Sequence, residues 1–96
     1  MPVGIILMNY TEQGVREIKG TTERIAQFEK LWESMGGKAL GTYLTMGQYD
    51  LVSVGETPSD EALATFVLKI GVAGNVRTTT LKGFTVEEAR RVLEKV

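Results

Sequence analysis

Tyr43, Tyr49 and Asp50 are the residues of this sequence whose types and spacing could do chemistry. All three fall in one short stretch around an expected β-turn. A carboxylate beside a phenol could act as a general base or accept a hydrogen bond from a ligand hydroxyl. Asp is depleted in β-strands, because its carboxylate prefers local backbone partners or water. Asp50, at the start of an expected strand, therefore either caps the turn through backbone N–H groups or serves a site.

Two further polar side chains are candidates. Arg77 stands in a threonine-rich run and could bind an anion, pair with Asp50, or form an ordinary surface or interface ion pair. Asn9 ends the first apolar run and could orient a ligand, although capping the following turn is the simpler interpretation. The candidates for ligand binding are therefore Tyr43, Tyr49, Asp50, Arg77 and Asn9, and no catalytic residue is assigned.

The composition excludes several kinds of site. The 96 residues include no Cys and no His. Disulfides, thiolate nucleophiles, zinc clusters and imidazole ligands are therefore impossible, as are Ser-His and Cys-His dyads. A general base would have to be Asp, Glu, Lys or Tyr with a pKa shifted by its surroundings. We expect no metal and no cofactor.

The charge pattern limits the possible partners. The chain has 11 basic and 12 acidic residues without a block of one sign. This pattern indicates neither a nucleic-acid footprint nor a basic patch for a membrane surface. No apolar run approaches the roughly 20 residues that span a bilayer. The start of the chain, residues 1–5, lacks the features of a signal peptide. We therefore expect a cytoplasmic protein without nucleic-acid or membrane partners.

Apolar spacing predicts one strand and one helix in the first part of the chain. Residues 3–10 form a strand that is apolar on both faces. A helix capped by Thr21 or Thr22 then runs to about residue 35 and buries a stripe that includes Phe28 and Trp32. Residues 39–46 and 49–54 form a hairpin, in which Gly47 supplies a positive φ.

The second half of the chain predicts two helices and one strand. A helix begins with Pro58 at its first position and ends at the glycines 71 and 74, and a strand spans residues 75–82. Thr85 and Glu88 form a capping box, after which a last helix runs to Val96. Its apolar residues are expected to face inward, and i,i+4 ion pairs are expected on its outer side. The inward set is Ala89, Val92, Leu93 and Val96, and the ion pairs are Glu87–Arg91 and Arg90–Glu94.

This order of elements predicts an α+β protein of one domain, residues 1–96. It is the ferredoxin-like βαββαβ arrangement with an added C-terminal helix, and its strand order is 4-1-3-2. Both main helices then cover one face of the sheet. The other face would be an apolar patch of several hundred Å², which soluble monomers rarely tolerate. We expect two copies to pack these faces together as a dimeric α+β barrel. The alternative is that the C-terminal helix covers part of this face.

Three separated segments resemble the GYD domain family. They are Asn9-Tyr10-Thr11-Glu12-Gln13-Gly14, Leu44-Thr45-Met46-Gly47-Gln48-Tyr49-Asp50-Leu51-Val52 and Gly74-Asn75-Val76-Arg77-Thr78-Thr79-Thr80-Leu81. The resemblance covers essentially the whole chain. It implies a fold like that of dimeric ferredoxin-like barrels and no defined activity.

Three functions are compatible with these observations. The first is a small oligomeric binding or sensory module, with a ligand pocket at the subunit or sheet interface. The second is a cofactor-independent enzyme that acts on a small organic molecule through a Tyr/Asp pair. The third is a purely structural assembly subunit.

Overall fold

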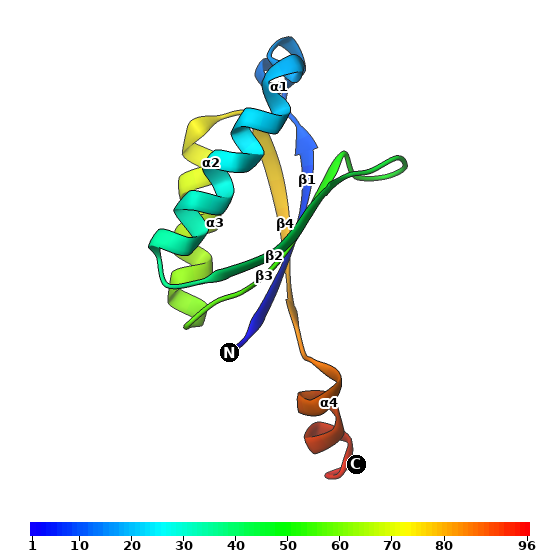
Figure 1. Ribbon diagram of the computed structural model, residues 1–96. Coiled ribbons are helices and arrows are strands. Elements are labelled where there is room, and N and C mark those ends of the chain that lie inside the picture. Colours follow the sequence, from blue (N-terminus) through cyan, green and yellow to red (C-terminus); the bar gives the residue numbers. More distant parts are fainter.

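The computed structural model describes all residues, 1–96, as a four-stranded antiparallel sheet with two long helices on one face (Figure 1). The elements are β1 (Val3–Tyr10), α1 (Glu12–Arg16), a 3-10 helix η1 (Ile18–Gly20), α2 (Thr21–Ser34), β2 (Lys38–Leu44), β3 (Leu51–Glu56), α3 (Asp60–Ala73), β4 (Val76–Gly83) and α4 (Val86–Leu93). The strand order is β2-β3-β1-β4. The predicted ferredoxin-like α+β fold and strand order are confirmed.

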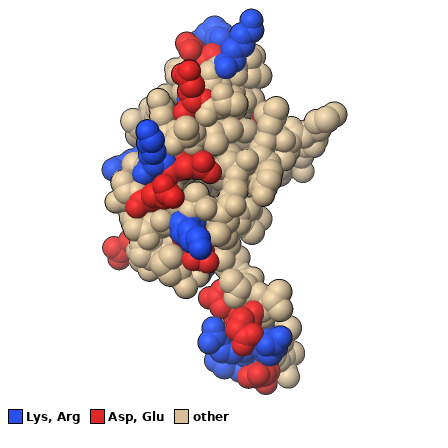
Figure 2. All heavy atoms as spheres, in the orientation of Figure 1, with Lys and Arg blue, Asp and Glu red and all other residues tan.

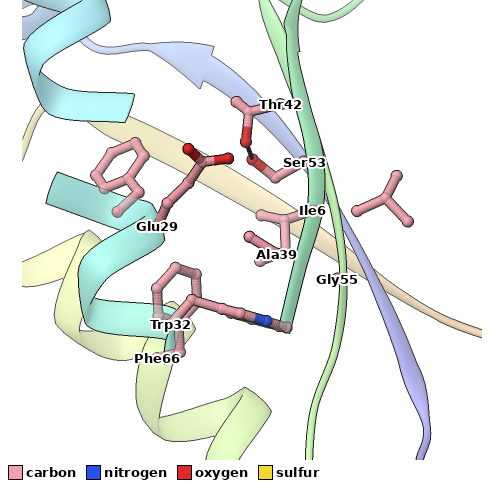
Figure 3. A pocket seen from close by; sticks show the side chains of 10 residues that line it. Ile6, Glu29, Trp32, Ala39, Thr42, Ser53, Gly55 and Phe66 are labelled. Carbon is pink, nitrogen blue, oxygen red and sulfur yellow. Dashed lines mark hydrogen bonds between the residues drawn. The ribbon is translucent and has the colours of Figure 1, made fainter. Parts of the chain in front are cut away.

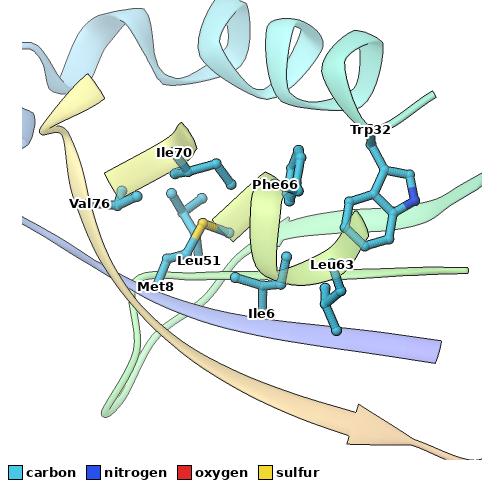
Figure 4. Close-up of a cluster of buried hydrophobic side chains, with 8 residues drawn as sticks. All are labelled: Ile6, Met8, Trp32, Leu51, Leu63, Phe66, Ile70 and Val76. Atoms are coloured by element: carbon cyan, nitrogen blue, oxygen red, sulfur yellow. The ribbon is translucent and has the colours of Figure 1, made fainter. Parts of the chain in front are cut away.

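β1 is central and pairs with β3 on one side and β4 on the other. Gly4, Ile6 and Met8 are buried beneath the helices, whereas the alternate residues Val3, Ile5 and Leu7 are half-buried on the other face. The core lies between the sheet, α2 and α3 (Figure 4). Its buried members are Ile6, Met8, Trp32, Leu51, Leu63, Phe66, Ile70 and Val76.

The indole of Trp32 packs in a space that two glycines leave open. A Cβ atom at Gly55 would lie 2.7 Å from Trp32 Cε2, and one at Gly37 would lie 2.6 Å from Nε1. Only a residue without a side chain leaves room for the indole there. The indole N–H donates to the carbonyl of Glu56 at 2.8 Å, and the ring meets Phe66 edge-on with centroids 4.6 Å apart. The predicted burial of Trp32 is confirmed.

The hairpin differs from the prediction. β2 ends at Leu44 and β3 begins at Leu51, so residues 45–50 form a six-residue loop in place of a two-residue turn. The Thr45 N–H donates to the Asp50 carbonyl at 2.8 Å, and the Thr45 hydroxyl donates to the Tyr49 carbonyl at 2.6 Å. Gly47 has the predicted positive φ, +121°. β2 also contains a bulge between Ala39 and Gly41.

The start of α2 also differs. Neither Thr21 nor Thr22 caps this helix; its N-cap is Gly20, without a side-chain hydrogen bond. The 3-10 turn of η1 runs directly into α2, so Thr21 is already helical. Its hydroxyl donates to the Ile18 carbonyl at 2.6 Å and lies 2.6 Å from the Tyr10 hydroxyl.

α3 begins later than predicted. Ser59 is the N-cap and accepts a hydrogen bond from the Ala62 N–H at 3.1 Å. Pro58 therefore lies outside the helix, because the serine hydroxyl supplies the acceptor that the first turn needs. At the other end Gly71 is still helical, and Gly74 is the left-handed C-cap with φ +84°.

The capping box of α4 is confirmed in both directions. The Thr85 N–H donates to Glu88 Oε1 at 2.9 Å, and the Glu88 N–H donates to Thr85 Oγ1 at 3.1 Å. The hydrogen bond from the Thr85 backbone holds the pKa of Glu88 below its usual value of 4.5. A depressed carboxyl pKa stabilises the folded form above that usual value, and this contribution is lost as the pH falls through the lowered pKa.

The position of α4 contradicts the prediction. The helix ends at Leu93 and projects beyond the end of the sheet, so its apolar residues do not face a core of the same chain (Figure 1). Leu93 is 66% exposed and Val96 is 100% exposed. The expected i,i+4 ion pairs are absent, and Arg90 instead pairs with Glu87 at 2.6 Å.

Candidate functional site

The three segments that resemble the GYD family meet at one end of the sheet. The Thr11 hydroxyl donates to the Gly74 carbonyl at 2.6 Å, and the Thr11 N–H donates to the Asn75 carbonyl at 3.1 Å. The Gln13 side-chain amide donates to Asn75 Oδ1 at 3.0 Å. These bonds join the turn after β1 to the turn before β4.

Asp50 joins the third segment to the same end. Its Oδ2 accepts a hydrogen bond from the Tyr10 N–H at 2.9 Å, while its own N–H donates to the Met8 carbonyl at 2.9 Å. The backbone pairing of β1 and β3 stops at Leu51. The carboxylate of Asp50 therefore accepts the hydrogen bond from β1 that a backbone carbonyl of β3 would otherwise accept, and it continues the β1–β3 pairing by one bond.

This geometry corrects two interpretations of Asp50. The carboxylate does not cap the loop around Gly47, because its partner lies 40 positions away in β1. It does not pair with Arg77 either. The structure contains three ion pairs, and neither residue takes part in any of them. The side chain of Asp50 joins two strands at their ends.

Replacing Asp50 should show this role. Asp50→Ala leaves the half-buried Tyr10 N–H without its acceptor and should lower the free energy of unfolding by about 1–3 kcal/mol. Asp50→Asn keeps an acceptor oxygen and should cost clearly less. Urea unfolding of both variants at pH 7 measures the difference. Equal losses in the two variants, or an unchanged Asp50→Ala, would contradict the assignment.

The other candidates lie apart from Asp50. Asn9 and Arg77 are opposite each other on β1 and β4, and Tyr43 lies on β2 opposite Val52. All three are on the sheet face that α2 and α3 leave uncovered. Tyr49 is half-buried in the loop, where only its carbonyl is hydrogen-bonded. No hydrogen bond joins a tyrosine side chain to Asp50, so the structure does not assemble the expected Tyr/Asp pair.

The uncovered side of the sheet is mainly apolar. We call it the open face. Its polar residues are Asn9, Arg77 and Thr79, and its apolar residues are Val3, Ile5 and Leu7 of β1, Tyr43 of β2, Val52 and Val54 of β3 and Leu81 of β4. The helices α2 and α3 lie on the opposite side, and α4 extends past the end of the sheet (Figure 1). The alternative in which the C-terminal helix covers this face is therefore wrong.

A narrow cleft opens between α2 and the β2–β3 hairpin, and its inner space of about 20 Å³ has room for about one water molecule (Figure 3). Aromatic side chains form one wall, and the hydroxyls of Thr42 and Ser53, 2.8 Å apart, lie on the sheet side. The half-buried carboxylate of Glu29 points toward this hydroxyl pair and has no hydrogen-bond or ion-pair partner. The lining residues are Ile6, Phe28, Glu29, Trp32, Ala39, Thr42, Ser53, Val54, Gly55 and Phe66.

Comparison with known proteins decides the family. A model of the GYD domain matches residues 5–93. The chain belongs to the GYD domain family. A search of curated proteins finds no match.

Solved structures agree with this GYD domain in fold. FFRP-DM1 is 27% identical, with a TM-score of 0.58 over 88% of this chain and 100% of that one. TTHA0845 from Thermus thermophilus is 22% identical, with a TM-score of 0.59 over 90% of this chain and 96% of that one. Protein PHS023 from Pyrococcus horikoshii is 23% identical, with a TM-score of 0.58 over 88% of this chain and 92% of that one.

The cleft of this GYD domain has the composition of a small-ligand site. Ligand pockets are lined mainly by apolar and aromatic side chains, with a few polar groups that fix the orientation of the ligand. The aromatic wall could hold an apolar body, and the Glu29 carboxylate could accept a hydrogen bond from an ammonium or hydroxyl group. No three acidic side chains come together as metal ligands would. No helix has both the length and the apolar character needed to cross a membrane.

Sequence reasoning missed this cleft. The helix pattern assigned Phe28 and Trp32 to the core. One signal was available in β3, whose helix-facing positions are Leu51, Ser53 and Gly55. The hydroxyl of Ser53, at a position where the core needs bulk, indicates unfilled space beneath the helix, whereas the space over Gly55 is taken by the Trp32 indole.

Proposed function

We propose that this GYD domain is a self-associating module that binds a small molecule. Two copies pack through their open faces, and each copy offers the cleft between α2 and the hairpin to a ligand. The observation that carries the proposal is the apolar open face, on which no element of the chain packs. Contiguous apolar patches of this kind usually mark interaction surfaces.

The ligand should combine an apolar body with a cationic or hydrogen-bond-donating group. Phe28, Trp32 and Phe66 line the cleft, and Phe28 is half-buried whereas the other two are buried. An organic cation is attracted to aromatic faces. Glu29 supplies the negative charge beside them and has no partner within the chain. A carboxylate ligand would meet this charge and be repelled.

Ligand binding in the cleft can be followed by the fluorescence of Trp32, because it is the only tryptophan and lines the cleft. Its fluorescence would be titrated with n-butylammonium, 1-butanol and butyrate. We expect butylammonium to bind about tenfold more tightly than butyrate, since the two differ in the sign of their charge beside Glu29. Glu29→Gln should remove most of this preference.

The matched control is Glu33→Gln, which removes an exposed carboxylate from the same helix. This variant should keep the preference for the ammonium. A response to none of the three compounds at millimolar concentration would refute the ligand site and leave the structural assembly subunit as the better account. The enzyme alternative loses its main support, because no tyrosine side chain is hydrogen-bonded to Asp50, whose Oδ2 accepts from the Tyr10 N–H.

A further inference from the structure

Two of the exposed apolar features lie on elements that project from the body of the domain. One is the hairpin tip, where Leu44 is 71% exposed and Met46 is 100% exposed. The other is the apolar stripe of α4, where Val86 is 79% exposed and Leu93 is 66% exposed. Exposed apolar side chains are ordinary when isolated, but each of these sets is clustered on one short element.

α4 needs a partner to be stable. Isolated helices shorter than about 12–15 residues are marginal in water, even with good capping. α4 has 8 residues and lies clear of the body of the domain (Figure 1). Its apolar stripe consists of Val86, Ala89 and Leu93, with Arg90 and Glu94 beside it. The capping box therefore stabilises the start of a helix whose apolar side packs on nothing in its own chain.

The hairpin tip and α4 lie at opposite ends of the sheet. Leu51, which follows the tip, is opposite Met8 near the end of β1, whereas Gly83, which precedes α4, is opposite Val3 at its start. The hairpin also bends out of the sheet, away from α2 and α3 (Figure 1). When two open faces stack about a two-fold axis that runs across the strands, the tip of each copy comes to the α4 end of the other.

The area of the open face favours this contact. A stable dimer buries about 800 Å² on each partner. Of the seven apolar residues of the open face, Tyr43 and Leu81 are exposed and the other five are half-buried within the single chain, so this face alone offers limited apolar area. The tip and α4 add two exposed apolar surfaces to each copy. Residues 44–49 include no charged side chain, so the tip can be buried without burying a charge (Figure 2).

We propose that, in the dimer, Leu44 and Met46 of each hairpin tip pack on the apolar stripe of α4 of the other copy. This inference rests on the proposed dimer through the open face. Met46 suits the contact, because its flexible and polarizable thioether fills irregular hollows. Each dimer contains the contact twice, once on each side of the two-fold axis.

Sedimentation equilibrium of the full chain tests the contact through two single substitutions. Leu93→Glu and Met46→Glu each place a charge in the proposed contact and should raise the dimer Kd at least about tenfold. Both residues are exposed in the single chain, so circular dichroism should show an unchanged fold. Arg91→Gln, on the polar side of α4, changes the charge by the same amount as Leu93→Glu and should leave the Kd unchanged.

A charge pair tests whether the two residues meet. Met46→Glu combined with Leu93→Lys should recover most of the lost association, whereas Met46→Glu combined with Leu93→Glu should not. A wild-type Kd in both single variants, or no recovery with the opposite charges, overturns the inference and leaves the open-face dimer standing. A wild-type chain that stays monomeric overturns both.

Discussion

Trp32→Ala is expected to lower the free energy of unfolding by about 3–5 kcal/mol. The indole is 6% exposed, packs edge-on against Phe66 and lies on Gly55. Its removal leaves a cavity and deprives the Glu56 carbonyl of its N–H donor. Because small domains have about 5–15 kcal/mol of stability in total, the loss would bring the variant close to unfolding.

Urea unfolding followed by circular dichroism measures this loss, since the substitution also removes the only tryptophan. Trp32→Phe is the control, because it keeps an aromatic ring and loses only part of the packing. Phe28→Ala should cost less than Trp32→Ala, because Phe28 is half-buried beside the cleft. A melting temperature of Trp32→Ala within a few degrees of wild type would show that the packing of this indole contributes little to the stability of the domain.

The second large effect is expected on association. Leu7 lies near the centre of the open face, with Val52 on one side and Thr79 on the other. Leu7→Lys would bring two ammonium groups into the apolar interface of a two-fold dimer, where neither has a partner. Burial of unpaired charge is costly, so the dimer Kd should rise by about a hundredfold or more.

The fold of this variant should survive, because Leu7 is half-buried on the face away from the core. Gln27→Lys adds the same charge at an exposed position of α2 and should not change the Kd. If Leu7→Lys associates as the wild type does, the open face is not the interface.

The fold could be predicted because its signals are local. A strand apolar on both faces, two helical stripes and a glycine turn together select the ferredoxin-like order. The hairpin boundaries could not be predicted, since the Asp50 carboxylate bonds to Tyr10, far away in the sequence. No local pattern reveals that a side chain replaces the backbone acceptor of a ladder.

The cleft could not be predicted for a similar reason. Its space depends on the indole of Trp32 lying on Gly55, and on a bulge that places both Ala39 and Thr42 on the helix side. Spacing alone indicates which residues point inward and does not show how completely they fill the space.

The error on α4 has a different physical cause. Amphipathic spacing shows that a helix has an apolar side, but not whether the partner of that side belongs to the same chain. Here β4 leads the chain past the end of the sheet, so the apolar side of α4 meets no core. The same spacing that predicted burial within the chain now favours burial between chains.

Self-association through the open face is the central claim, and the molar mass in solution tests it most directly. Light scattering of the wild-type chain, measured across a series of micromolar concentrations, should give twice the 10.5 kDa mass of one chain or a larger multiple built from dimers. The apparent mass should fall toward one chain only on dilution. A particle of 10.5 kDa throughout the micromolar range would contradict the claim.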